Sequence, residues 1–574
     1  MSAWDVIEEA VKTAAFASEI QPLRDQMAEP GRAGFDAFIG KLTGRIGEQQ
    51  TRIREQEKRI AILEEARRLD ALARFAAKAD RIRDLHPDQL ELLALEPGLH
   101  EAEVEAVLAQ PPAGQQAEAP AVAAAVKARR YNKKPHPGRE ELPAHLRRED
   151  ILIDEAPAPL PGGILPRELR RDTTERLAVT PAEYYVERIT TVSYIFPGQP
   201  DKGVHRGCGP AGIMAKSILS PGVIIEFLVS KYADHMPIYR KVMALERDHG
   251  IVLSYPTADR GVIDAAALVI PLSDAMLCEL LAGNYLQADE TRIAVMDPEV
   301  KGKTATGFFW TYSHPRGQVV YRYHPGRGGK YARSDLEGMA GWLQTDGYQV
   351  FQSLANLFGE KVKHCACLSH VRRKFVEIVR INKDVAGFSA IVDTAAAIVA
   401  RIGELYAIER QLKEAGADTA TREAVRAERS LPIFDQLMSE LNAAALDENL
   451  LPGGALAKAC AYALKLRAQL RRSLENGVTE IDNNRCEQSI RPVALGRKNW
   501  LHIGAPSATE PVAAIMSVVE SCKRMGINVR DYLTDILPRL ASARPDEQAA
   551  LAATLTPTKW LAARTPAAPA ANPA

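Results

Sequence analysis

Residues 341–375 read GWLQTDGYQVFQSLANLFGEKVKHCACLSHVRRKF, and this stretch decides the fold. Its first apolar run leads directly into Asp346, and its second, Val362–Cys367, leads into the basic helix start VRRKF, as two strands of a sheet would. An aspartate at the tip of a strand carries a charge that is costly to bury without a partner, and a divalent metal ion is one such partner. Because metal-dependent phosphodiester chemistry uses converging carboxylates, we expect further acidic residues to join Asp346.

A second aspartate occupies the same kind of position upstream. The apolar run Tyr285–Ala288 ends at Asp289, and two further runs, Phe308–Tyr312 and Val319–Tyr323, predict a meander of strands. With the two strands of residues 341–375, this makes five. The pattern therefore predicts a mixed α/β core with an aspartate at the end of each of two strands.

A third carboxylate follows on a predicted helix. In the segment IDNNRCEQSIRP (481–492), Asp482 or Asn483 is the expected N-cap and Pro492 the expected end. The four-residue spacing places Asn483 and Glu487 on one helix face. Any one such acidic residue is usually a solvated surface residue. Two strand-end aspartates followed by a helical glutamate, however, form the arrangement of a ribonuclease-H-like two-metal site.

Six runs spread along the chain carry a family resemblance: FAAKADRIRDLHPDQLELL (75–93), KYADHMPIYRK (231–241), YLQADET (285–291), GWLQTDGY (341–348), CLSHVRRKF (367–375) and DNNRCEQSIRPVALGRKNWLHIG (482–504). In these runs the chain resembles transposases of the insertion sequence 66 family, and the last run is the longest and most specific. The resemblance implies that Asp289, Asp346 and Glu487 are the catalytic, metal-binding triad of a DDE transposase. It implies Mg²⁺ or Mn²⁺, two ions, as the cofactor.

The resemblance also implies a reaction and partners. We expect metal-dependent cleavage at the terminal inverted repeats of an insertion sequence, followed by strand transfer into target DNA. The implied partners are double-stranded DNA, a second copy of the chain in a homodimer or higher oligomer, and two small accessory proteins encoded by the same element. A different class of function stays open: a catalytically inactive, DNA-binding and dimerising protein derived from a transposase. A general metal nuclease without strand transfer is a third.

Composition sets further limits. A chain of 574 residues is too long for one core. Its formal net charge is zero, so any contact with DNA must come from local basic patches. Its 7 cysteines are scattered and odd in number, which favours a reducing cytoplasm over a disulfide framework. The longest apolar run, near Gly222–Val229, is too short to span a bilayer, so we expect a bacterial cytoplasmic, nucleoid-associated protein without membrane contact.

Composition, pattern and the family resemblance together predict seven segments in this multidomain chain: a helical, coiled-coil dimerisation region (1–95); an Ala/Pro linker and basic arm (96–150); a degenerate zinc-finger-like β module, implied by the resemblance (151–208); a helical DNA-binding region before the core, also implied by the resemblance (209–284); a ribonuclease-H-like catalytic domain (285–500) with an all-α insertion at about 384–476; a C-terminal helical domain (501–564); and a disordered tail (565–574). Ile46, Ile53 and Ile60 recur at seven residues, which favours a parallel coiled coil. A helix folded back on its own domain is the alternative. The insertion is either a lid or spacer, or a holder of DNA ends.

Residues 151–208 depart from the family pattern. The family carries a cysteine-rich zinc module here, whereas this chain has no cysteine between Ile151 and Pro200, and Cys208 stands alone. A structural zinc site needs four ligands. We therefore expect the β scaffold, with a strand pair in YYVERITTVSYIF (184–196), but not zinc.

Basic residues in three places are candidate DNA contacts, because cations at helix starts and in flexible arms suit phosphate. These are Arg372, Arg373 and Lys374; Arg491, Arg497 and Lys498; and, in the arm, Lys127, Arg129, Arg130, Lys133 and Lys134. For the arm, a solvated linker is an equal alternative. Cys367-x-x-His370 is half a zinc site by spacing, but the resemblance favours a role, with Asn483, in shaping the active site.

Overall fold

The computed structural model describes residues 22, 25–26, 28–75, 183–189, 193–195, 204–206, 213–214, 217–299, 302–347, 349–383, 385, 387–447 and 453–564. The chain forms two compact units, one made of residues 1–111 and 211–574 and the other of residues 112–210. The predicted basic arm and the disordered tail lie outside the described residues.

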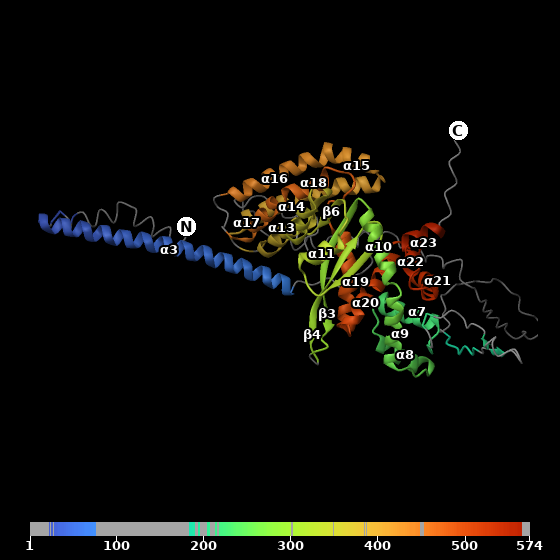
Figure 1. Cartoon of the computed structure of the whole chain (residues 1–574). Coiled ribbons are helices and arrows are strands. Elements are labelled where there is room, and N and C mark those ends of the chain that lie inside the picture. Colours follow the sequence, from blue (N-terminus) through green and yellow to red (C-terminus); the bar gives the residue numbers. More distant parts are fainter. Residues whose placement is uncertain are drawn as a thin grey trace, which may run out of the picture. The chain divides into compact units, whose positions relative to one another are not determined.

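A five-stranded mixed sheet forms the centre of the larger unit (Figure 1). Its strand order is β5-β4-β3-β6-β7. The strands are β3 (Tyr285–Met296), β4 (Thr304–Ser313), β5 (Val319–His324), β6 (Gly341–Thr345) and β7 (Val362–Ala366). β3, β4 and β5 form an antiparallel meander, and β3, β6 and β7 run parallel. The five predicted strands and the mixed α/β class are confirmed.

The strand that carries Asp289 is longer than predicted. The sequence analysis ended it at Ala288, but β3 continues to Met296, so Asp289 lies inside the strand rather than at its end. The reason is β4, which pairs with β3 from Gln287 to Met296. Asp289 therefore has its backbone position fixed by a partner strand, whereas Asp346 directly follows the last residue of β6.

Helices from both ends of the larger unit cover the β5 side of the sheet. Those before the sheet are α7 (Pro221–Tyr232), α8 (Ile238–His249), α9 (Tyr255–Ala267) and α10 (Ile270–Ala282); those after it are α20 (Thr509–Arg524), α21 (Val529–Ser542), α22 (Gln548–Ala552) and α23 (Pro557–Arg564). α20 and α10 contact β5. The hydroxyls of Ser517 and Ser521 accept the backbone N–H groups of Tyr321 and Val319, which fastens α20 to this edge strand. Ile515 and Val519 of α20 are buried.

Among the residues that the structure describes, one helical segment has the length and apolar composition needed to cross a membrane, Tyr255–Ala282. The sequence analysis placed the longest apolar run near Gly222–Val229, and that prediction was wrong. The segment consists of α9 and α10, and both contact α20. Val262 and Leu272 are buried within the chain. A helix in a protein core meets the same criteria of length and composition.

The described residues between β7 and the helix of Glu487 form helices only. These are α13 (Leu368–Asn382), α14 (Ser389–Glu414), α15 (Thr419–Val425), a π-helical segment η3 (Arg426–Ser430), α16 (Leu431–Leu446), α17 (Ala455–Lys465) and α18 (Arg467–Leu474). We call residues 384–476 the helical insertion. Apolar residues of these helices, including Ile402 and Leu437, join one buried cluster with residues of α13. In Figure 1 these helices run from yellow to orange, and α18 contacts β7.

The helix of Glu487 is α19 (Asn484–Trp500), and it does not end at Pro492 as predicted. Proline lacks the N–H that would bond the carbonyl of Gln488, which is why it usually ends a helix. Here burial overrides that preference, because Val493 and Gly496 pack inside the protein beyond it. A Cβ on Gly496 would lie 2.3 Å from Cζ2 of Trp500, so the tryptophan ring is packed directly on the glycine.

Two shorter helices, α11 (Gly329–Asp335) and α12 (Gln349–Phe358), and two 3-10 turns, η2 (Gly359–Lys361) and η4 (Pro506–Ala508), complete the larger unit's connections. Trp310 of β4 meets Phe351 of α12 edge to face, with ring centroids 5.7 Å apart. α12 therefore covers the sheet face to which Trp310 points.

The N-terminal helix α3 (Glu29–Phe75) is 47 residues long. Near its C-terminal end, Glu65 is only 2% exposed and accepts hydrogen bonds from the side chain of Asn382 and the backbone N–H of Ala455. Ile60 and Leu63 are exposed. The predicted coiled coil requires a second chain and stays a prediction.

In the smaller unit, β1 (Ser193–Ile195) pairs antiparallel with β2 (Val204–Arg206). The strand pair predicted within residues 184–196 was wrong, because residues 183–189 form no strand and the partner of β1 lies beyond Pro200.

Candidate active site

The register of two parallel strands brings the two aspartates together. β3 and β6 pair Gln287 with Gln344. Side chains two residues apart on a strand point to the same face. Asp289 lies two residues beyond Gln287, and Asp346 lies two residues beyond Gln344, so both carboxylates reach neighbouring positions at the same face and end of the sheet.

The start of α19 is fastened to this same part of the sheet. The side-chain amide of Asn483 donates to the carbonyl of Ala288 at 3.2 Å, and Sγ of Cys486 lies 3.8 Å from the carbonyl of Thr311. Glu487 is one turn further along the helix and therefore comes to the two aspartates. Asn483 is the N-cap residue of α19, but its side chain does not cap the helix. Instead, the carboxylate of Asp482 accepts the backbone N–H of Asn484.

The electrostatics of Asp289 show that the three carboxylates interact. Its pKa is raised well above the ordinary value, first by burial and then by the negative charges of Asp346, Glu290 and Glu487. The N–H of Glu290, which donates to Asp289 at 2.8 Å, offsets only part of this. Burial also raises the pKa of Glu290, although Arg327 pairs with its carboxylate. Without a cation, Asp289 is thus held in an environment that disfavours its charge.

Glu487 has basic neighbours on α13. Its Oε2 lies 3.4 Å from a guanidinium nitrogen of Arg373, and its Oε1 lies 3.4 Å from Nδ1 of His370. The latter pair lacks hydrogen-bond geometry, so Oε1 is a buried carboxylate oxygen without a hydrogen-bond partner among the described residues. Oδ1 of Asn483 is in the same situation. Buried oxygens without hydrogen-bond partners can instead be ligands of a cation, so these two atoms fit an oxygen-ligated metal ion.

Cys367 and His370 lie beside Glu487. The sulfur of Cys367, His370 and Glu487 offer three donor atoms within 4.8 Å of one another. The Cys367 sulfur also accepts the N–H of Asn483 at 3.2 Å, and burial raises the pKa of this thiol well above its ordinary value. Cys367 therefore connects the starts of α13 and α19. A closed structural zinc site needs a fourth ligand, which these three residues do not supply.

The other predicted basic residues lie in different settings. Arg372 is half-buried on α13, and Lys374 is exposed with its ammonium 4.5 Å from the ring centroid of Tyr462. Arg491 is exposed on α19. Partial burial of its guanidinium lowers its pKa, and the negative charge of Glu487 opposes this shift. Arg497 and Lys498 lie near the C-terminal end of α19. Arg497 donates to the carbonyl of Arg292 and Lys498 is exposed. Lys127, Arg129, Arg130, Lys133 and Lys134 lie outside the described residues.

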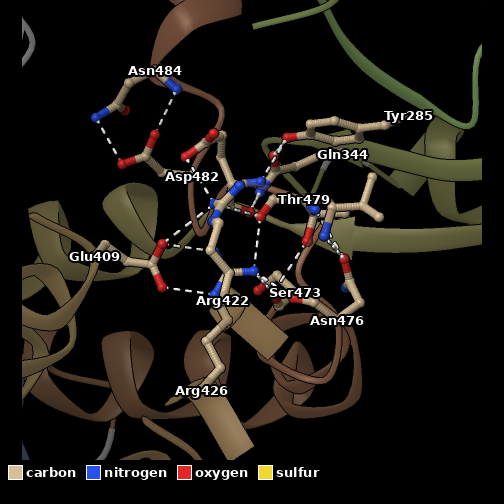
Figure 2. Close-up of polar contacts among 12 residues, drawn as sticks. Tyr285, Gln344, Glu409, Arg422, Arg426, Ser473, Asn476, Thr479, Asp482 and Asn484 are labelled. Atoms are coloured by element: carbon tan, nitrogen blue, oxygen red, sulfur yellow. Dashed lines mark hydrogen bonds and ion pairs between the residues drawn. The ribbon is translucent and has the colours of Figure 1, made fainter. Parts of the chain in front are cut away.

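The sequence patterns did not predict the polar residues that join strands β3 and β6 to the loop before α19, among them Tyr285 and Gln344 (Figure 2). Gln344 donates to the carbonyl of Glu480 at 2.8 Å, Gln287 donates to the carbonyl of Asp482 at 2.9 Å, and the hydroxyl of Tyr285 accepts the N–H of Glu480 at 3.1 Å. The signal was a glutamine inside each of two apolar strands, in YLQ and WLQ. A buried amide must find partners, and here both partners belong to the loop before α19.

Comparisons with known proteins give one family model and several similar proteins. A family model described as transposase IS66 family matches residues 216–510. The uncharacterized protein y4qI of Sinorhizobium fredii is 30% identical over 421 residues, which cover 71% of this chain and 75% of the relative. The uncharacterized protein y4jD of the same organism is 30% identical over 416 residues, covering 70% of this chain and 78% of the relative.

Proposed function

This chain belongs to the transposase IS66 family, and on that basis we propose that it is a DDE transposase of an insertion sequence. In this proposal the chain binds the terminal inverted repeats, cleaves a DNA strand there in a metal-dependent reaction, and transfers the freed 3′-hydroxyl end to target DNA. Asp289, Asp346 and Glu487 are the catalytic residues.

The observation that carries the proposal is the meeting of three carboxylates from distant parts of the chain. β3, the residue after β6, and α19 supply one each, and the charges of Asp346 and Glu487 both raise the pKa of Asp289. A protein gains no stability from such a group of like charges. A divalent cation that binds them reverses the repulsion.

The sheet gives a second line of support. An antiparallel meander of β3, β4 and β5 that continues into parallel β6 and β7 has the strand content of a ribonuclease-H-like core. In mixed α/β sheets, sites form where strands end at one edge and a helix comes to them. Asp346 and Glu487 have this placement.

The donor set fits Mg²⁺ or Mn²⁺ because these ions prefer carboxylate and carbonyl oxygens. When bound, two such ions supply the activation of the attacking oxygen and the stabilisation of the leaving oxygen. The chain's own part is to hold the three carboxylates. Arg373 of α13 donates to the Glu487 carboxylate and orients it, and Asn483 ties its helix to β3. Cys367 offers a soft sulfur donor, which suits zinc better than magnesium, and we do not assign it to this site.

We further propose that DNA contacts the exposed basic residues beside the site, Arg491 and Lys498, together with the arm around Lys127–Lys134. Phosphate contacts of this kind position DNA without reading its sequence. A homodimer or higher oligomer, accessory proteins of the same element and a place in the bacterial cytoplasm follow from the family assignment as proposals.

The test is binding and cleavage of a labelled duplex that carries the terminal repeat, with Mg²⁺ or Mn²⁺, by the full chain, by Asp346→Asn and by Asp546→Asn. Asp546 is an exposed acid far along the chain and serves as the matched control. We expect all three proteins to bind the duplex, and the wild type and Asp546→Asn to nick it. Nicking by Asp346→Asn at the wild-type rate would refute the active-site assignment.

Binding by all three proteins with nicking by none, also after addition of the element's accessory proteins, would favour the alternative function. In that case the chain is a DNA-binding protein that has lost catalysis.

A further inference from the structure

The helical insertion holds the loop that leads to Glu487 through one buried arginine (Figure 2). Arg426 is 0% exposed. One of its terminal nitrogens donates to three backbone carbonyls, those of Ser473 at 3.0 Å, Asn476 at 2.5 Å and Thr479 at 2.9 Å. Its other two nitrogens donate to both oxygens of Glu409, each at 2.7 Å.

Arg426 satisfies a set of groups that no other side chain could satisfy alone. A guanidinium has five N–H donors in a planar fork, whereas a lysine ammonium has three donors on one atom. Glu409 neutralises the buried charge from one side of the guanidinium, and the three carbonyls share the two N–H groups of the terminal nitrogen on the other side. Arg422 adds a bond to the carbonyl of Thr479 at 3.2 Å and also pairs with Glu409.

The backbone is irregular at this residue. Arg426 begins the π-helical segment η3, a form that is rare and frequently found at functional sites. The buried residues of this segment are Arg426 and Ser430, and both are polar. A helix of the insertion thus departs from regular geometry at the point where it supplies the arginine.

The same loop is fastened on its other side to the catalytic sheet. Gln344 of β6 binds the carbonyl of Glu480, and Tyr285 of β3 binds its N–H. Residues 477–482, which directly follow the insertion, therefore lie between the insertion and strands β3 and β6. α19 begins directly after this segment, so its placement sets where Glu487 lies.

The insertion makes a second contact at the site. The hydroxyl of Tyr462 donates to the backbone carbonyl of Asp346 at 2.9 Å. The next residue, Gly347, has φ +86°, and a Cβ there would lie 3.0 Å from Cδ1 of Leu466 and 3.3 Å from the Tyr462 hydroxyl. The turn after Asp346 is thus packed against α17 and the residue that follows it.

We propose that the helical insertion is a positioning element of the active site, with Arg426 fixing Glu487 and Tyr462 fixing Asp346. Arg426 and Tyr462 are positioning residues and touch neither metal nor DNA in this scheme. The inference rests on the proposed function, because it takes Asp289, Asp346 and Glu487 as the site. It answers why a nuclease-type core carries 140 residues between Asp346 and Glu487, a question that a simple spacer leaves open.

The experiment compares the full chain with Arg426→Lys, with the charge swap Arg426→Glu/Glu409→Arg, and with the control Arg401→Lys. Arg401 pairs with Glu440 inside the same insertion but has no contact in the described residues to the loop before α19. Three quantities are measured: Mn²⁺ affinity of the protein without DNA, binding of the terminal-repeat duplex, and the nicking rate.

We expect Arg426→Lys to weaken Mn²⁺ binding and to slow nicking roughly tenfold or more, with end binding unchanged, since a displacement of about 1 Å at a catalytic group can cost about a hundredfold. Arg401→Lys should match the wild type. The charge swap should leave Mn²⁺ affinity low, because it restores the ion pair but not the bonds to the three carbonyls. Wild-type Mn²⁺ affinity and nicking in the swap would overturn the proposal for Arg426.

Tyr462→Phe keeps the test decisive if the Arg426 variants do not fold. This change removes one hydroxyl and leaves the ring beside Lys374. We expect a roughly threefold to tenfold slower nicking rate, a slightly lower unfolding temperature from the lost hydrogen bond, and unchanged end binding. An unchanged nicking rate in a folded Tyr462→Phe protein would overturn the positioning role.

The two levels of inference fail in different ways. If the wild type does not nick, or if Asp346→Asn nicks normally, the proposed function fails. If the wild type nicks and Asp346→Asn does not, but Arg426→Lys and Tyr462→Phe match the wild type in Mn²⁺ affinity and rate, only the positioning role fails.

Discussion

Asp482 gives the sharpest prediction, because its titration links the loop before Glu487 to pH. Part of the residue reaches solvent, but its carboxylate lies among protein atoms, and burial is the largest cause that raises its pKa from 3.8 to about 7. The N–H of Asn484 donates to it and offsets part of this shift. We therefore expect Asp482→Asn, which keeps the shape and removes the charge, to change how stability depends on pH.

The direction and size follow from linkage. A carboxyl whose pKa is higher in the folded than in the unfolded protein contributes stability at low pH, and that contribution is lost as the pH rises through the folded-state pKa. For Asp482 the loss runs from near pH 4 to about pH 7. Between pH 5 and pH 8 it amounts to about 2.7 kcal/mol, from about two pH units at about 1.36 kcal/mol each.

The assay is urea-induced unfolding of the metal-free full chain at pH 5 and pH 8, followed by tryptophan fluorescence. Other buried acids, such as Asp289, titrate in both proteins and cancel in the difference between variant and wild type. Relative to the wild type, Asp482→Asn should gain about 2.7 kcal/mol on going from pH 5 to pH 8. The exposed-acid control Asp546→Asn should show no such gain. A stability difference for Asp482→Asn that is the same at both pH values would refute the reasoning.

Three further outcomes are expected. Gly347→Ala should slow nicking and lower the free energy of unfolding by about 1–3 kcal/mol, because φ is +86° there. Gly302 also has a left-handed backbone but has open space around it, so Gly302→Ala should lower stability without slowing nicking. Mn²⁺ affinity should rise from pH 6 to pH 8, because a proton must leave Asp289, whose pKa is raised by burial and by neighbouring carboxylates; a flat profile would contradict this. Lys498→Gln should reduce the slope of log affinity for the terminal-repeat duplex against log salt by about 0.9, and an unchanged slope would remove Lys498 from the DNA contacts.

The strands and the order of the three carboxylates could be predicted because their signals are local. Alternating or continuous apolar runs end at Asp289 and Asp346, and a capped amphipathic pattern surrounds Glu487. The length of β3 could not be predicted in the same way, because the residues beyond Asp289 are held by pairing with β4 and are polar in part. A strand partner distant in the sequence decides where such a strand ends.

Two other features depended on tertiary structure. Pro492 is a local signal to end a helix, and the packing of Val493 and Gly496 overrides it. Arg426 lies in the run RAERS, which has the composition of a solvated helix face. Only the fold brings the carbonyls of three residues around its guanidinium, so no pattern in the sequence distinguishes it from the exposed arginines nearby.

The long interval between the second and third carboxylates has a consequence for synthesis on the ribosome. Protein domains form in the order in which they are made. All five strands of the sheet are complete by Ala366, but Glu487 is made about 120 residues later, after the whole helical insertion. A chain released early therefore has the sheet and two aspartates without the glutamate. We expect such a fragment to be unable to cut DNA, and a variant with a stop codon at residue 484 would test this by the nicking assay. Because Glu487 follows the helical insertion in the sequence, DNA cleavage becomes possible only after the insertion has been synthesised.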